Sequence, residues 1–317
     1  MSWVLLHTLY NTAHPGPLSG APTLAGPLSL HGAAPRLPEC FGGSSALTSL
    51  RLTTCDSITS LPDSIGGLTA LTTLTLDICT QLTGLPDSIS GLTRLTALSL
   101  HDCSRLTRLP NSIGELTALV TLDLSYCAAL VGVPDSIGDL AALTTLELCY
   151  CDSLEALPDA IGNLAALRTL ELAYCRSLQS VPASIGALTQ LSALACTAAA
   201  TCLPDAIGEL RALTLLDLCG CYALTRLPDS IGGLRALTQL KMFGCESLTA
   251  LPESYGDLAA LTDLDLHDCG ALTRLPDSIT RLAALQRVRI VNCMALRNNT
   301  AALVCKSWGS GIFAVVP

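Results

Sequence analysis

Residues 61–84 read LPDSIGGLTALTTLTLDICTQLTG, and residues 85–108 read LPDSISGLTRLTALSLHDCSRLTR. The same pattern fills residues 37–298 without a gap, as ten repeats of 24 residues and one of 22 that starts at Val181. The eleven repeats begin at Leu37, Leu61, Leu85, Leu109, Val133, Leu157, Val181, Leu203, Leu227, Leu251 and Leu275. Such a period predicts a solenoid, in which each repeat buries its apolar face against its neighbours.

The columns of the repeat predict its secondary structure. Positions 1, 5, 8, 11, 14, 16 and 22 are apolar, and positions 14 and 16 have the spacing of a short strand with one face inward. Position 2 is proline in all eleven repeats, position 3 is mostly acidic, and position 6 is glycine in nine of eleven. Proline at a first helical position followed by an acid predicts a short helical or 3-10 turn. Stacked repeats then form a parallel sheet.

The consensus LxxLxLxxCxxLxxLPxxIGxL resembles the leucine-rich repeat over residues 37–298. The cysteine variant with LPxSIG is similar to the repeat regions of plant-type nucleotide-binding disease-resistance receptors. It also resembles Ras-binding-type intracellular scaffolds, which commonly have asparagine in place of the cysteine. The resemblance implies an α/β fold, a right-handed leucine-rich-repeat solenoid or horseshoe with a parallel concave sheet and short helical or 3-10 turns on the convex side.

Two terminal segments lie outside the repeats. Residues 1–35 contain no Asp, Glu, Lys or Arg and hold five prolines, so we expect residues 1–36 to be an uncharged Pro/Gly/Leu-rich leader or a degenerate N-terminal cap. Residues 299–317 include Trp308 and Phe313, which suit a C-terminal cap or tail. The apolar run Trp3–Leu6 is too short for a secretory signal. No run reaches the roughly 18 apolar residues of a membrane span.

Composition and motifs exclude several classes of protein. The net charge is −9 and aromatic residues make up 3%, which disfavours nucleic acid as a partner. The two lysines, Lys241 and Lys306, do not follow glycine, so the chain has no P-loop. The five histidines form no HExxH motif. The sequence thus predicts no enzyme activity, no cofactor and no metal.

Ten of the sixteen cysteines occupy position 19 of the repeat. This column is predicted to face inward where the strand ends, and its thiols to act as weak donors to turn carbonyls. Side chains stacked in one direction have poor disulfide geometry, so reduced thiols and a cytoplasmic location are expected. The column comprises Cys55, Cys79, Cys103, Cys127, Cys151, Cys175, Cys221, Cys245, Cys269 and Cys293.

His101-Asp102-Cys103 recurs as His267-Asp268-Cys269 at positions 17 to 19. The two triplets are seven repeats apart, or roughly 33 Å at the spacing of neighbouring strands, so they cannot form one site. We interpret them as polar surface positions rather than catalytic residues.

Positions 15 and 18 predict a candidate binding surface. Position 15 flanks the inward leucine at position 16 and therefore faces outward on the sheet, while position 18 lies at the rim. Acids and tyrosines coincide in consecutive repeats, which suits a protein partner with a basic or amphipathic segment. The alternative is that tyrosine merely suits a strand end and that the charges keep the sheet soluble. The candidate partner-binding residues are Asp123, Glu147, Glu171, Asp217, Tyr126, Tyr150 and Tyr174.

A second acidic column, at position 3, has a structural explanation. Nine of the 26 acids lie there, directly after the proline, where they stabilise the start of a helical turn.

The sequence therefore predicts a non-enzymatic protein-protein recognition module that presents a concave sheet surface. The resemblance implies a role in intracellular signalling or plant-type defence. Alternatives are a co-receptor that binds a small ligand on the concave face, and a regulatory scaffold subunit of a signalling enzyme complex.

Overall fold

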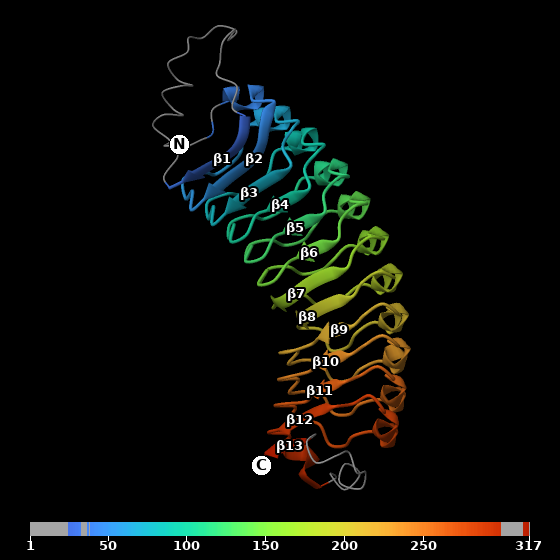
Figure 1. Cartoon of the computed structure of the whole chain (residues 1–317). Coiled ribbons are helices and arrows are strands. Elements are labelled where there is room, and N and C mark those ends of the chain that lie inside the picture. The colour runs from blue at the N-terminus through green and yellow to red at the C-terminus, as the bar shows by residue number, and fades with distance from the viewer. Residues whose placement is uncertain (1–24, 33–36, 38, 299–312, 317) are drawn as a thin grey trace. The chain divides into compact units, whose positions relative to one another are not determined.

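The computed structural model describes residues 25–32, 37, 39–298 and 313–316. The chain divides into two compact units, Met1–Ser153 and Leu154–Pro317. In each unit the strands lie on one side and the helical turns on the opposite side (Figure 1). The predicted caps fall largely outside the described residues, which include two short strands of these segments, β1 and β13.

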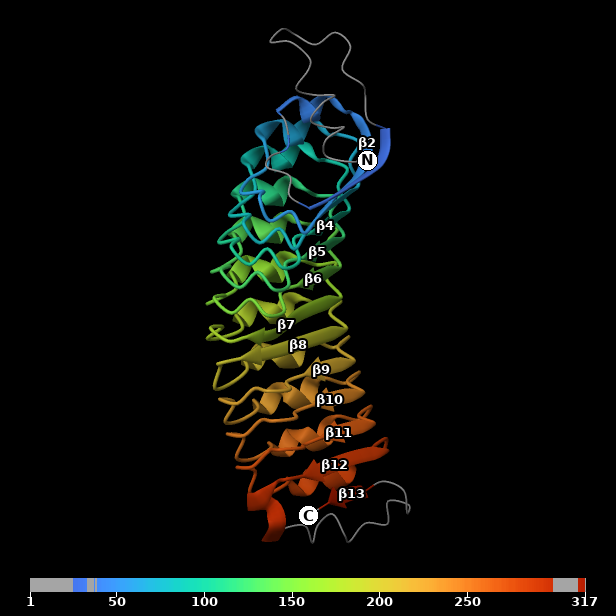
Figure 2. The ribbon, with the colours of Figure 1, turned by 90° about the vertical axis from the view of Figure 1, so that its left-hand side faces the viewer.

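The strands follow the chain order and pair in parallel (Figure 2). In the N-terminal unit they are β1 (Ala25–His31), β2 (Ala46–Thr53), β3 (Thr73–Asp77), β4 (Ala97–Ser99), β5 (Thr121–Asp123) and β6 (Thr145–Glu147). In the C-terminal unit they are β7 (Thr169–Cys175), β8 (Ala193–Ala198), β9 (Leu215–Asp217), β10 (Gln239–Lys241), β11 (Asp263–Asp265), β12 (Arg287–Val291) and β13 (Phe313–Val316).

Every helical element described is a 3-10 turn of five residues. The N-terminal unit has η1 (Glu39–Gly43), η2 (Asp63–Gly67), η3 (Asp87–Gly91), η4 (Asn111–Glu115) and η5 (Asp135–Asp139). The C-terminal unit has η6 (Asp159–Asn163), η7 (Ala183–Ala187), η8 (Asp205–Glu209), η9 (Asp229–Gly233), η10 (Glu253–Asp257), η11 (Asp277–Arg281) and η12 (Met294–Asn298). The predicted solenoid of parallel strands and 3-10 turns is therefore confirmed.

The core lies between strands and turns and follows the predicted columns. In the second repeat the predicted inward side chains are all buried, with at most 4% exposure: Leu61, Ile65, Leu68, Leu71, Leu74, Leu76 and Leu82. The same columns are buried from repeat to repeat, so each coil continues the core of the one before it.

The proline at position 2 precedes the helical turn instead of beginning it. Pro62 has extended backbone angles, φ −69° and ψ 151°, and its carbonyl accepts the first turn bond from the Ile65 N–H. The prediction of proline at the first helical position was thus wrong by one residue. The first helical residue is the acid, Asp63, which makes no side-chain capping bond. Its effect is limited to the favourable charge at the start of the turn.

The glycine at position 6 is required by packing between coils. A Cβ on Gly66 would lie 2.3 Å from the carbonyl oxygen of Ser88 in the next repeat. Gly114 stands in the same relation to Ser136, at 2.4 Å. Glycine at this position therefore allows the backbones of successive 3-10 turns to approach each other.

The cysteine column faces inward as predicted, but its main acceptor differs. The Cys103 thiol donates to the Leu76 carbonyl over 3.0 Å, and Cys127 donates to Leu100 over 3.2 Å. Both carbonyls belong to the inward strand leucine of the preceding coil, rather than to a turn. Burial raises the pKa of Cys103 to about 12, so this thiol stays protonated near neutral pH.

Candidate functional site

The rim residue at position 18 has a left-handed backbone in almost every repeat. Its N–H points toward the next coil, as in the bond from the Tyr126 N–H to the Cys149 carbonyl over 2.7 Å. This bond extends the strand ladder by one residue and explains the conformation. Positive φ values are found at Thr54, Ile78, Asp102, Tyr126, Tyr150, Tyr174, Gly220, Gly244, Asp268 and Asn292.

Two of the predicted tyrosines stack at this rim in the N-terminal unit. The ring centroids of Tyr126 and Tyr150 are 4.4 Å apart, and their planes differ by 12°. Tyr126 is 43% exposed. The pair therefore offers a flat aromatic surface to solvent, of the kind that forms anchors in protein interfaces.

Two of the predicted acids lie beside each other on the sheet. Asp123 at the end of β5 pairs in register with Glu147 at the end of β6. Neighbouring strands are about 4.8 Å apart, so two like charges are held close together. Burial, then the charge of Asp123, raises the pKa of Glu147, whereas His101 acts in the opposite direction.

His101 contacts one of these acids, Asp123, and one of the stacked tyrosines, Tyr126. Its Nδ1 lies 3.4 Å from Oδ2 of Asp123, and its ring centroid lies 5.1 Å from that of Tyr126. The other carboxylate oxygen of Asp123 accepts a hydrogen bond from the Ser125 N–H over 2.9 Å. We call this group the acidic–aromatic cluster: His101, Asp123, Tyr126, Glu147 and Tyr150.

The remaining candidate residues belong to the C-terminal unit. Glu171 lies in β7 and is partly exposed, and Tyr174 lies in the same strand and is 40% exposed. Asp217 ends β9, where its carboxylate is 3.2 Å from the Lys241 ammonium. Its charge is thus already compensated within the chain.

Asp217 is one of three acids on this sheet face that pair with a base one coil later. Oδ2 of Asp265 is 3.4 Å from Nη1 of Arg289, and Asp263 contacts Arg287. Burial opposes ionisation of Asp263, yet hydrogen bonds from Arg287 and Thr262 outweigh it and lower the pKa of Asp263. The side chains of Lys241, Asp263, Asp265, Arg287 and Arg289 line a hollow of about 210 Å³ on β10 to β12.

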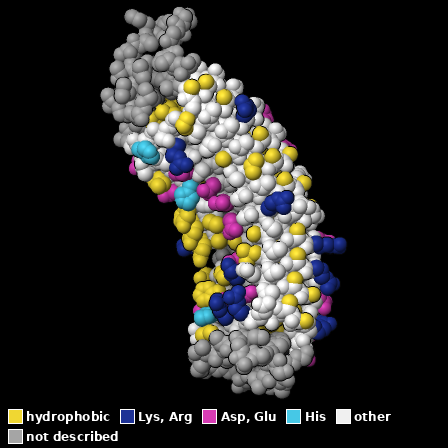
Figure 3. All heavy atoms as spheres, in the orientation of Figure 1, with side chains coloured by type: hydrophobic (Ala, Val, Ile, Leu, Met, Phe, Trp, Pro, Cys, Tyr) yellow, Lys and Arg dark blue, Asp and Glu magenta, His cyan; other side chains and the backbone are white. Residues whose placement is uncertain are grey.

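A second aromatic group at the rim of the C-terminal unit was not predicted. Tyr222 is 58% exposed and Phe243 is 44% exposed, and the Phe243 ring lies edge-on to His267 with centroids 5.4 Å apart. Phe243 and His267 both occupy position 17 of the repeat. Side chains alternate along a strand, so position 17 faces outward, and this column of the sequence already indicated the group. Figure 3 shows hydrophobic, acidic and histidine side chains gathered on the side of the sheet.

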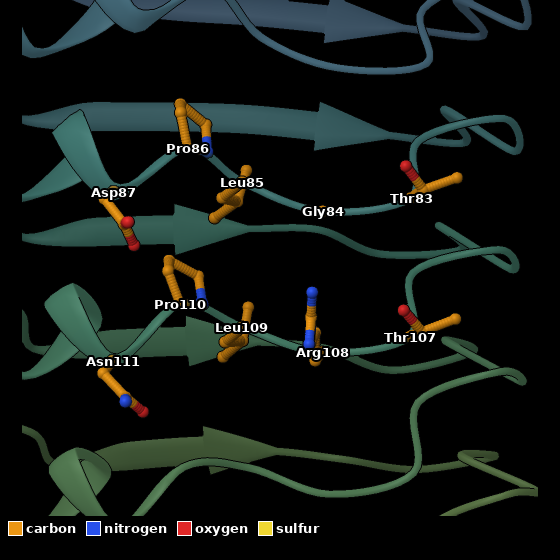
Figure 4. A pocket seen from close by; sticks show the side chains of 10 residues that line it. All are labelled: Thr83, Gly84, Leu85, Pro86, Asp87, Thr107, Arg108, Leu109, Pro110 and Asn111. Atoms are coloured by element: carbon orange, nitrogen blue, oxygen red, sulfur yellow. The ribbon is translucent and has the colours of Figure 1, made fainter.

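Two further depressions lie between successive loops away from the strands. One of about 600 Å³ is formed by residues 83–87 and 107–111, where the Arg108 side chain extends toward Gly84 (Figure 4). A similar one recurs at residues 202–205 and 226–230. Both repeat with the coils and bring no set of catalytic groups together, so we attribute them to the architecture.

A metal-binding cluster and a membrane-spanning helix are both absent from the described ranges. These residues contain no group of three or more His, Cys, Asp or Glu arranged to hold a metal ion. In the same part of the chain, no helix has the length and apolar character needed to cross a membrane.

Many solved structures share this fold. A leucine-rich-repeat protein of Leptospira interrogans is 24% identical, with a TM-score of 0.56 and 83% of each chain covered. A TDR receptor is 22% identical, with a TM-score of 0.59, 86% of this chain and 49% of that chain covered. The Toll–Spatzle complex of Drosophila gives 17% identity, a TM-score of 0.63, and coverage of 83% and 40%.

At these identities the structural matches establish the fold alone. A search of curated proteins gives no match. The model of the family described as "Leucine-rich repeat region" matches residues 38–149 and 122–246. Together with the stacked parallel coils, this match shows that the chain belongs to the leucine-rich-repeat family.

Proposed function

We propose that this protein is a non-enzymatic recognition module that binds another protein on the exposed face and rim of its sheet. The observation that supports this most strongly is the acidic–aromatic cluster, in which a stacked tyrosine pair lies beside two adjacent carboxylates. Exposed tyrosines supply large contact area, and the acids attract a basic or amphipathic segment. The column of buried thiols fits a reducing compartment such as the cytoplasm. The role we propose there is in signalling or plant-type defence, which the resemblance of the repeat implies.

The experiment is quantitative affinity purification from extracts of the source tissue, with the wild type and a Tyr126→Ala/Tyr150→Ala/Tyr174→Ala variant as baits. Tyr222→Ala is the matched control, because Tyr222 is also an exposed tyrosine but lies outside this group. A partner that the wild type and the control retain, and the triple variant loses, is then purified and its binding measured directly. If every retained protein binds the triple variant as well as the wild type, this surface is not the recognition site.

A further inference from the structure

The C-terminal unit shows how this sheet compensates its carboxylates. Asp217, Asp263 and Asp265 each contact a Lys or Arg from the next coil. In the N-terminal unit the acids at the ends of β5 and β6, Asp123 and Glu147, lie opposite each other instead of opposite a base. Within the described residues, neither Asp123 nor Glu147 has a Lys or Arg within 4.0 Å, and His101 is the basic group nearest to Asp123.

The nearest basic residue in the same column is too distant to compensate these acids. Arg51 occupies position 15 of the first repeat, three coils before Asp123. At the spacing of neighbouring strands this is about 14 Å, beyond a Debye length at physiological ionic strength. The pair of carboxylates is thus open to a cation from another molecule.

The geometry favours a planar cation. Two carboxylates on neighbouring strands can both accept from one guanidinium, whose N–H groups form a rigid fork. A guanidinium also stacks on aromatic rings, and His101 contacts both Asp123 and Tyr126, so an aromatic face lies one side chain away from the acids. An ammonium would neutralise the charge but would not use the rings through a planar face.

Resting on the proposed function, we propose that the acidic–aromatic cluster binds an arginine side chain of the partner protein. The guanidinium lies between Asp123 and Glu147, and the side chain packs against the stacked rings of Tyr126 and Tyr150.

The identity of the rim residues supports this assignment. The left-handed backbone at position 18 is adopted at lower cost by glycine, as at Gly220 and Gly244, than by tyrosine. The ladder bond explains the conformation but not the presence of tyrosine in three consecutive repeats, at Tyr126, Tyr150 and Tyr174. A binding role for the rings accounts for their presence despite this cost.

The test uses the full chain and the capped tripeptide acetyl-Ala-Arg-Ala-amide, with congeners that carry lysine or neutral citrulline in place of arginine. Binding is followed by NMR of ¹³C-labelled tyrosine rings, assigned with Tyr126→Phe and Tyr150→Phe. We expect saturable shifts of these two ring signals with the arginine peptide, at least about threefold weaker binding of the lysine peptide, and none with citrulline.

The variant Asp123→Asn/Glu147→Gln should weaken binding of the arginine peptide about tenfold or more, because charge-assisted hydrogen bonds are lost. The matched control is Asp265→Asn, which removes an acid that is already paired with Arg289, and it should bind like the wild type. Thermal unfolding of each variant verifies that it is folded.

Three results would overturn the assignment: absence of shifts, equal binding of lysine and arginine peptides, or undiminished binding by the double variant. Shifts of the same rings by CaCl₂ that block the peptide would reassign the cluster to a metal cation. The proposed function is judged separately. A partner that needs the tyrosines but does not compete with the arginine peptide contradicts only this inference, whereas peptide binding without tyrosine-dependent partners contradicts only the proposed function.

Discussion

Tyr126 and Tyr150, one repeat apart in the chain, stack face to face with ring centroids 4.4 Å apart while both have a left-handed backbone. The Tyr126 N–H takes part in a ladder that any residue could form, whereas the two rings form a flat aromatic surface. The proposed interface role of this pair and the structural role of the backbone beneath it can therefore be separated by mutation.

The first prediction distinguishes the effect of the surface charge on association from the effect of the tyrosine on dissociation. Against a purified partner, Glu147→Lys should mainly slow association and reduce its salt dependence, because exposed charges steer encounter. Tyr150→Ala should mainly speed dissociation. The binding free energy should weaken by about 1–3 kcal/mol, the range for a central anchor. Biosensor kinetics at two salt concentrations measure both. Wild-type kinetics in both variants would show that this face is only a solvated sheet.

The control for that experiment is the neighbouring core residue Leu148, which is fully buried. Leu148→Ala should lower the free energy of unfolding by about 2–5 kcal/mol, through lost burial and a residual cavity. The two surface variants should keep a stability close to that of the wild type, since their side chains lie outside the leucine core.

The second prediction concerns the cost of the left-handed rim. Ile78 has φ 57° and is 40% exposed, so a β-branched side chain occupies a strained conformation for little burial. Ile78→Asn should raise the free energy of unfolding by about 1 kcal/mol, measured by urea denaturation, because asparagine adopts this conformation more readily. Val131→Asn is the control, since Val131 is 50% exposed but lacks a positive φ. Equal effects of the two changes would refute the argument from strain.

The third prediction follows from the raised pKa of Glu147. Between its ordinary value of 4.5 and the higher folded value, the native state binds more protons than the unfolded state, so stability falls as pH rises. Glu147→Gln removes that penalty and should raise the Tm at about pH 7, with the gain disappearing toward about pH 4. A lower Tm at neutral pH would mean that the carboxylate is stabilising where it stands.

The fold followed from the sequence because each inward column recurs at a fixed position, and residues of one column, such as Ile65 and Ile89, are alike fully buried. Details that depend on contact between coils did not follow. The role of Gly66 became visible only when Ser88 of the next coil lay against it. The pattern of the repeat describes the residues within one coil, whereas these contacts form between two successive coils.

The candidate surface was predictable in the same partial sense. Asp123, Glu147, Tyr126 and Tyr150 were found by their outward columns, and the structure stacks the two rings. The compensation of Asp217 by Lys241 needed the register of β9 and β10. His101 was interpreted as a plain surface position, because nothing in its own repeat shows that it contacts Asp123 of the next one.

The fourth prediction concerns the thiols. Burial raises the pKa of Cys103 to about 12. Burial, together with the neighbouring Cys103, also raises the pKa of Cys127. Because the thiolate is the reactive form, iodoacetamide should modify the exposed Cys202 well before these two, as mass spectrometry of the native protein would show. Freshly purified protein should also contain no disulfides between column cysteines. Several such bridges would contradict both this expectation and the cytoplasmic assignment.

The last prediction places a weak point in the short repeat that starts at Val181. There Ala199 stands in the cysteine column and cannot supply the thiol donor that Cys103 gives to Leu76. The pairing of β7 with β8 also shifts register between Leu172 and Cys175, so that Cys175 lies opposite Ala198. Stability in a solenoid is a sum over neighbouring interfaces, so these losses act locally.

Hydrogen exchange should therefore be faster across residues 195–203 than in the equivalent turns of the fifth and ninth repeats. One bond acts in the opposite direction: the Cys221 thiol donates to the Cys196 carbonyl over 2.8 Å and ties the short repeat to its successor. Cys221→Ala should widen the difference in exchange rate, because it removes that tie. Equal protection of all three turns in the wild type would show that neither the missing thiol nor the shifted register weakens the short repeat.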